Sequence, residues 1–124
     1  MTTSQLTISD VASETGLTTS TLRYYEQEGL LREPVDRASS SHRRYDVAAV
    51  RWVTFVTKLR STGMPIRDIR RYAELAREGE HTTPDRLALL VAHRERVAAQ
   101  LAEVQASLTA IDYKIDTYER FLTK

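Results

Sequence analysis

The chain contains no cysteine, which excludes a disulfide, a thiolate metal site and a redox-active thiol. Its three histidines, His42, His81 and His93, lack the close spacing of a metal-ligand pair. We therefore expect no metal and no other cofactor. No nucleophile motif or glycine-rich phosphate loop is present either, so the chain is not expected to be an enzyme.

Long hydrophobic runs are also missing. No stretch is long enough to span a bilayer, and the first ten residues, MTTSQLTISD, lack the basic and apolar regions of a signal peptide. These two absences predict a cytoplasmic protein with no membrane partner. A hydrophobic content of 41% is nevertheless sufficient for a packed core, and 124 residues suit one compact domain plus one extended element.

The charge is small overall but unevenly distributed. The net charge is +1, yet residues 1–72 hold 11 basic and 8 acidic side chains, whereas residues 73–124 hold 7 and 9. Within residues 37–71 the excess is largest, with 9 basic side chains against 2 acidic ones. This distribution indicates that only the first part of the chain faces phosphate.

Two short helices are predicted near the N-terminus. The first covers residues 8–15, because Ile8, Val11 and Ala12 recur at helical spacing before Gly16. Thr18 is placed to cap the second helix, and Gly29 can adopt the left-handed conformation that ends it. A helix, a short glycine turn and a second helix form the DNA-reading unit of helix-turn-helix proteins.

The second helix and the loop after it carry the predicted DNA-binding residues, which are Thr19, Thr21, Arg23, Tyr24, Tyr25, Arg43, Arg44 and Tyr45. Arg23, Tyr24 and Tyr25 are consecutive, so they spread over roughly 200 degrees of the helix and cannot all be core. Tyr25 partly shares the buried face with Leu22. The alternative is a solvated arginine beside packed tyrosines and a solvated pair of loop arginines.

Two further helices are expected after this loop. Val50, Val53, Val56 and Leu59 predict a third helix over residues 46–61. A fourth helix is predicted over residues 66–78, ending at Gly79. Residues 79–84 are predicted to be a linker, so the DNA-binding domain is expected to cover residues 1–78.

The strongest pattern in the second half is a heptad repeat between Leu87 and Leu122, where eleven positions alternate in spacings of three and four. Ten of the eleven are apolar or aromatic, Arg94 being the exception. Since no glycine or proline follows Pro84, one dimerisation helix of ~38 residues is expected over residues 85–124. Such a seam needs a partner of equal length, which predicts a homodimer. The predicted dimerisation residues are Leu87, Leu90, Val97, Leu101, Val104, Leu108, Ile111 and Ile115.

Several aromatic side chains could line a pocket for a small-molecule effector between this helix and the DNA-binding domain, namely Trp52, Phe55, Tyr72, Tyr113 and Tyr118. Aromatic residues at helical spacing more often serve packing, so both interpretations stay open.

The chain resembles the MerR family of transcription regulators. The resemblance rests on LTISDVASETGLTTSTLRYYEQEGLL, then HRRYD, then TGMPIRDIRRY, and on the long terminal helix. It departs from the family pattern before the first wing arginine, where Ser41 and His42 replace the usual glycine and aromatic residue. Arg60 matches a basic family position that contacts the DNA backbone.

This resemblance implies a mainly α fold in which a winged helix-turn-helix precedes a long C-terminal helix that pairs as an antiparallel coiled coil. The pattern itself leaves parallel and antiparallel pairing open. The resemblance further implies a homodimer that binds a palindromic operator and distorts the promoter so that RNA polymerase can engage. The alternatives are a constitutive architectural protein, a simple repressor without an effector, and a coiled-coil interaction module.

Overall fold

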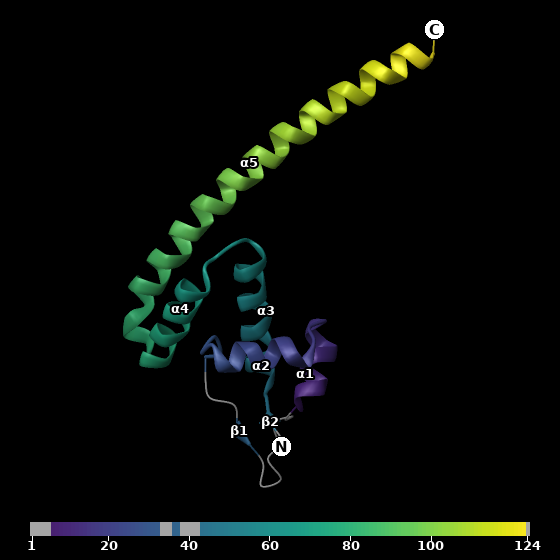
Figure 1. Cartoon of the computed structure of the whole chain (residues 1–124). Coiled ribbons are helices and arrows are strands. Elements are labelled where there is room, and N and C mark those ends of the chain that lie inside the picture. The colour runs from purple at the N-terminus through teal and green to yellow at the C-terminus, as the bar shows by residue number, and fades with distance from the viewer. Residues whose placement is uncertain (1–5, 33–35, 38–42, 124) are drawn as a thin grey trace. The chain divides into compact units, whose positions relative to one another are not determined.

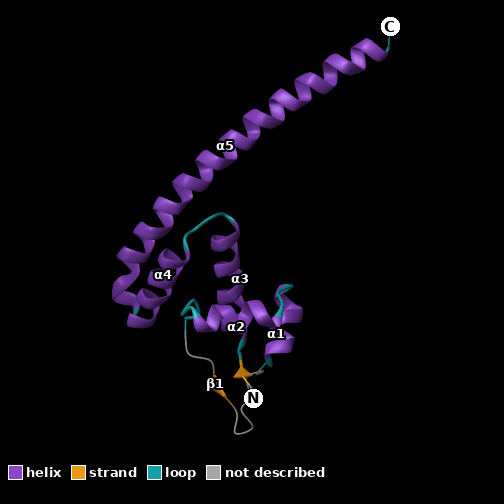
Figure 2. Ribbon diagram, in the orientation of Figure 1, coloured by secondary structure: helices purple, strands orange, loops and turns teal. Residues whose placement is uncertain are grey.

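A computed structural model describes residues 6–32, 36–37 and 43–123, with the backbone alone for residues 36–37 and 43–44. The fold is mainly helical (Figures 1 and 2), and clusters into two compact units, Met1–Leu89 and Leu90–Lys124. The elements in chain order are α1 (Ile8–Thr15), α2 (Thr19–Gln27), β1 (Asp36–Arg37), β2 (Arg43–Arg44), α3 (Val47–Ser61), α4 (Ile66–Glu78), a 3-10 helix η1 (Glu80–Thr82) and α5 (Thr83–Leu122).

The predicted first helix is confirmed, and its two ends have clear local causes. At its start, the Thr7 N–H donates to the Asp10 carboxylate at 2.9 Å and the Asp10 N–H donates back to the Thr7 hydroxyl at 3.2 Å. At its end, Gly16 adopts a φ of 75° and donates its N–H to the Ala12 carbonyl. This turn leads directly into α2.

The second helix begins and ends as its sequence predicts. The Thr18 hydroxyl accepts a hydrogen bond from the Thr21 N–H at 3.1 Å, which caps the helix. Gly29 has a φ of 72° just beyond the helix end, a conformation in which a side chain would be strained. Leu22 and Tyr25 face inward, and both are buried.

The wing is a short antiparallel pair of strands in which Asp36 lies opposite Arg44 and Arg37 opposite Arg43. Leu6 and Tyr45 form a further bridge, with N–H to carbonyl distances of 2.6 and 2.8 Å. The base of the wing is thereby tied to the segment that precedes α1. The predicted wing-tip residues Ser41 and His42 lie outside the described residues.

The hydrophobic core of the first unit lies where α1 packs on α2 and α3, and where α4 packs on α3. Asp46 caps α3 by accepting from the Ala49 N–H at 2.8 Å, and α4 ends at Glu78 as predicted. The largest fully buried side chains of this core are Val11, Leu22, Tyr25, Leu30, Val53, Val56 and Ile69.

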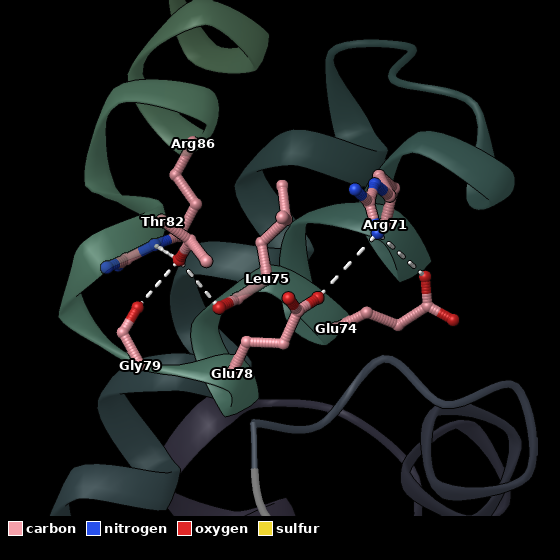
Figure 3. A network of polar contacts seen from close by, with 7 residues as sticks. All are labelled: Arg71, Glu74, Leu75, Glu78, Gly79, Thr82 and Arg86. Atoms are coloured by element: carbon pink, nitrogen blue, oxygen red, sulfur yellow. Dashed lines mark hydrogen bonds and ion pairs between the residues drawn. The ribbon is translucent and has the colours of Figure 1, made fainter.

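Residues 79–84 differ from the predicted linker. The Thr82 hydroxyl lies 2.7 Å from the carbonyl oxygens of both Leu75 and Gly79 and shares its hydrogen between them (Figure 3). This contact folds the segment back on the end of α4, so η1 forms and α5 already begins at Thr83. A 3-10 helix and the first turn of α5 thus lie where the sequence predicted a linker.

The long helix α5 spans 40 residues, or ~60 Å at 1.5 Å per residue. The predicted dimerisation residues all lie on it, and beyond Val97 every one of them is exposed, as Leu101 at 67% and Ile115 at 50% illustrate. Its apolar seam is therefore uncovered within one chain. Among the described residues, no helix is long and apolar enough to cross a membrane.

Candidate DNA interface

The outward face of α2 presents the side chains predicted to read DNA. Arg23 is exposed, whereas Thr19, Thr21 and Tyr24 are partly exposed. The Thr18 hydroxyl donates to the Thr21 hydroxyl at 3.0 Å, which leaves the hydrogen of the Thr21 hydroxyl free to donate outward. These side chains form a mixed donor surface of the kind that contacts base edges and phosphates.

Arg60 in the last turn of α3 is joined to this surface. Its guanidinium carbon lies 5.2 Å from the centre of the Tyr24 ring and 5.8 Å from that of the Tyr25 ring, within the range of a cation–π interaction. The side chain is exposed, and it has no acceptor among the described residues. Its N–H groups can therefore bind a phosphate while its flat face stays on the tyrosines.

Two of the predicted DNA-binding side chains are core residues instead. Tyr25 is 1% exposed and Tyr45 is 4% exposed. The Thr57 hydroxyl donates to the Val53 carbonyl at 2.8 Å, so the Tyr25 hydroxyl is the donor in its 3.0 Å contact with Thr57. The prediction that these two side chains contact DNA is wrong, because both are buried in the core, where Tyr25 bonds to Thr57 of α3.

The wing arginines Arg43 and Arg44 are placed in β2 by their backbone, while their side chains lie outside what the structure describes. Their contact with phosphate or the minor groove stays a prediction. Exposed basic side chains elsewhere in the first unit include Arg51, Lys58 and Arg67. By contrast, Arg71 pairs with Glu74 and Glu78 at 3.9 and 3.8 Å (Figure 3).

Side chains from α3 and α4 hold the segment that connects α2 to the wing. The Arg70 Nε donates to the Glu28 carbonyl at 2.7 Å, and its guanidinium donates to the Glu28 carboxylate at 2.6 Å. The Trp52 Nε1 donates to the Leu30 carbonyl at 2.8 Å. Neither contact could be predicted from the sequence, because each joins residues more than 20 positions apart.

A third donor completes this arrangement, because the Arg77 guanidinium bonds to the Leu31 carbonyl. Carbonyl groups that leave a helix need partners when they are not in water. Here the partners come from two other helices, so the position of the wing connection depends on α3 and α4.

One pKa shift bears on the helix-turn-helix. Hydrogen bonds from the Thr7 N–H, and then from the Thr7 hydroxyl, hold the pKa of the Asp10 carboxyl below its ordinary value. The negative charge of Asp10 stabilises the N-terminus of α1. It also maintains the capping box that fixes the entry to the reading unit.

The aromatic residues predicted to line an effector pocket fall into two groups. Trp52 stacks on Tyr72 with ring centres 5.4 Å apart, and Phe55 lies 6.0 Å from Tyr72, all within the first unit. Tyr113 and Tyr118 belong to the second unit and are exposed. In the part of the chain that the structure describes, no group of three or more histidine or acidic residues could hold a metal ion.

A capped helix-turn-helix, a two-stranded wing and an exposed basic face together define a winged helix-turn-helix DNA-binding protein. The sequence pattern of the MerR HTH family regulatory proteins matches residues 6–76, and that of the MerR DNA-binding region matches residues 50–113. The chain belongs to the MerR family and is a DNA-binding transcription regulator of that type.

Individual relatives agree with this assignment. An uncharacterised HTH-type transcriptional regulator of Haemophilus influenzae is 33% identical over 92% of this chain and 84% of its own length. The regulator AdhR of Bacillus subtilis is 38% identical over 74% of this chain and 65% of its own length.

Solved structures show the same fold. A protein of Listeria monocytogenes described as a MerR family transcriptional regulator has a TM-score of 0.87 and 34% identity, covering 92% of this chain and 86% of its own. HiNmlR, a MerR family regulator that lacks the sensor domain, was solved bound to promoter DNA. It has a TM-score of 0.85 and 32% identity, covering 94% of this chain and 92% of its own.

Proposed function

We propose that this regulator is a homodimer that binds a palindromic promoter operator and controls transcription by distorting the DNA. In this proposal the first domain, residues 1–78, binds DNA, and the helix over residues 85–124 pairs with its copy. RNA polymerase is the partner at the promoter. A small-molecule effector would bias the distorted state.

The observation that carries the dimer is the uncovered seam of α5. Leu101, Val104, Leu108 and Ile111 are 47–67% exposed and follow one another at heptad spacing. Exposed apolar side chains in such a row have a strong tendency to pair, and a second copy offers a seam of the same length. Antiparallel pairing follows from the resemblance to the family.

Distortion of the operator follows from stiffness. In the proposed dimer, two DNA-binding domains are joined by stiff helices of ~60 Å, which fix their separation. The DNA must therefore bend or twist so that both half-sites of the operator reach these domains. Bending DNA by the amount needed costs about 1–6 kcal/mol, which phosphate contacts must repay. The exposed arginines around α2 and α3 are suited to supply these contacts. The promoter-bound structure of HiNmlR supports binding at a promoter.

The dimer is tested by placing a charge in the seam. Leu101→Asp and Leu108→Asp each introduce a carboxylate where an apolar contact is expected, and a buried unpaired charge is strongly unfavourable. Ala106→Asp is the matched control, because position 106 is on the opposite side of the same helix and is exposed.

Analytical ultracentrifugation at micromolar protein should show monomers for both seam variants and dimers for the control. Dimers in all three variants would refute this interface. If the control is also monomeric and its helical circular dichroism is lost, the substitution unfolds the helix itself, and the loss of the dimer is not specific to the seam.

A further inference from the structure

A cavity of about 450 Å³ lies within the first compact unit, beside the segment that connects α2 to the wing. Its lining comes from four parts of the chain and includes Arg32, Trp52, Gly79, Glu80, Thr83 and Arg86. Cavities that bind small organic molecules have volumes of roughly 300–1,000 Å³ and usually combine apolar walls with a few polar groups. The volume of this cavity lies in that range, but its lining is mostly polar, with Trp52 as the one aromatic wall, so it suits a charged ligand better than an apolar one.

The charge of the cavity is positive and only partly compensated. The Arg86 Nε donates to the Thr82 hydroxyl at 3.1 Å and its guanidinium to the Thr83 hydroxyl at 3.0 Å. These neutral partners orient the guanidinium without cancelling its charge. Arg32 has no ion pair within the described residues, and Glu80 is the one acidic side chain in the lining.

Other arginines of this unit are different. Arg70 is paired with the Glu28 carboxylate at 2.6 Å, and Arg71 lies near two glutamates. Neither cavity arginine has a carboxylate partner among the described residues, so guanidinium N–H groups remain there for a ligand. Guanidinium groups bind carboxylates through paired, charge-assisted hydrogen bonds.

The aromatic wall of the cavity is held in a fixed orientation. The Trp52 ring stacks on Tyr72 at an angle of 15°, and its Nε1 is occupied by the Leu30 carbonyl. A tryptophan fixed on one face and at its polar edge offers a rigid surface for a flat ring. The cavity therefore combines a planar wall with anion-binding side chains.

We propose that this cavity binds a small planar organic anion of the aromatic carboxylate class, with the carboxylate on Arg32 and Arg86 and the ring against Trp52. The inference rests on the proposed function in one respect, namely that the anion acts as the effector. Trp52 also bonds to Leu30, which precedes the wing, so a ligand against this ring changes the support of the wing connection. Binding at the cavity is thereby coupled to operator affinity.

The chain provides its own probe, because Trp52 is its single tryptophan. The purified protein without DNA is titrated with benzoate while tryptophan fluorescence is recorded. A saturable change is expected. Benzamide has the ring without the charge, and acetate has the charge without the ring. The affinity for each should be lower than that for benzoate by about ten-fold or more.

Arg86→Gln should weaken benzoate binding by about ten-fold or more, since the variant cannot form the charge-assisted hydrogen bonds. Arg96→Gln, at an exposed position on α5 away from this cavity lining, is the matched control and should bind benzoate normally. Thermal melts by circular dichroism establish that both variants are folded. No saturable change, an equal response to benzamide, or equal losses in both variants would overturn the site.

The effector role is tested separately by operator binding with and without benzoate. Binding to the operator without benzoate tests the proposed function alone. If the protein does not bind the operator, the proposed function is wrong, but the fluorescence result for benzoate still stands. Saturable benzoate binding should shift the operator affinity in the wild-type protein but not in Arg86→Gln at the same benzoate concentration. Benzoate binding with unchanged operator affinity would overturn the effector role.

Discussion

The guanidinium of Arg70 on α4 holds the C-cap residue of α2, since it donates to both the carbonyl and the carboxylate of Glu28, at 2.7 and 2.6 Å. This pairing joins two residues that are 42 positions apart in the sequence. It means that the end of the reading helix depends on α4 as well as on its own cap. The two side chains are 40% and 36% exposed, so solvent weakens the pair without removing it.

Arg70→Ala should lower the free energy of unfolding by about 1 kcal/mol, because the variant lacks a partly exposed charged hydrogen bond and the bond to the Glu28 carbonyl. Arg71→Ala is the control, since Arg71 forms only long surface pairs at 3.9 and 3.8 Å and should have a smaller effect. Urea denaturation of both variants measures the difference. Equal effects would show that the Glu28 pairing has no special role.

Tyr25→Phe tests the assignment of Tyr25 to the core rather than to the DNA interface. The change removes the hydroxyl that donates to Thr57 and should lower the free energy of unfolding by about 1 kcal/mol. Operator affinity should remain within about two-fold of wild type. Tyr24→Phe, whose ring is partly exposed on the same helix, should cost less stability. A large loss of operator affinity in Tyr25→Phe with unchanged stability would restore a DNA-binding role for Tyr25.

Arg23→Ala tests base reading by the exposed face of α2. If the guanidinium contacts a guanine, the variant should lose about 1–3 kcal/mol of binding free energy at the operator and much less on unrelated DNA. Competition experiments with the two DNAs measure this ratio. Equal losses on both would show that Arg23 only positions the protein on the backbone.

Arg60→Ala should behave differently, because Arg60 lies on the tyrosine rings with its N–H groups directed at no described acceptor. We expect weaker binding to operator and unrelated DNA alike, and a salt slope that falls by about 1 for each phosphate that the variant no longer binds. Arg60→Lys retains the charge and should keep most of the salt slope. An effect confined to the operator would contradict binding to the DNA backbone.

The capping carboxylate of Asp10 should make the stability of the protein depend on pH in the acidic range. Its pKa is lowered in the folded state by the Thr7 N–H and hydroxyl, so its contribution to stability is present above its unfolded pKa, which is about 4. That contribution is lost as the pH falls through the lower folded value. The stability difference between wild type and Asp10→Asn should therefore shrink on acidification. A difference that grows at low pH would be incompatible with the capping role.

The sequence predicted the helices where the cause was local. Thr18, Gly16 and Gly29 act within four residues of the ends that they define, and the structure places those ends as expected. The uncovered seam of α5 was likewise readable from its spacing. Local patterns of this kind need no knowledge of distant neighbours.

The features that were predicted wrongly or not at all depend on contacts between residues that are distant in the sequence. The spacing of Tyr25 from Leu22 indicated only a partly buried position, and the contact that completes its burial is with Thr57, which is 32 residues away. In residues 79–84, the Thr82 hydroxyl bonds back to the Leu75 carbonyl, a contact seven residues away that the sequence pattern does not reveal. The hydrogen bonds of Arg70 and Trp52 to the wing connection were invisible for the same reason.

Distortion of the operator by the dimer is measured most directly by energy transfer between fluorophores at the two ends of an operator fragment. With wild-type protein, the transfer should rise on binding because the ends approach one another, and it should not rise with Leu101→Asp. Insertion or deletion of single base pairs in the promoter spacer should then alter transcription in parallel. Unchanged transfer in a saturated complex, with transcription indifferent to spacer length, would contradict the distortion mechanism and favour simple occlusion of polymerase.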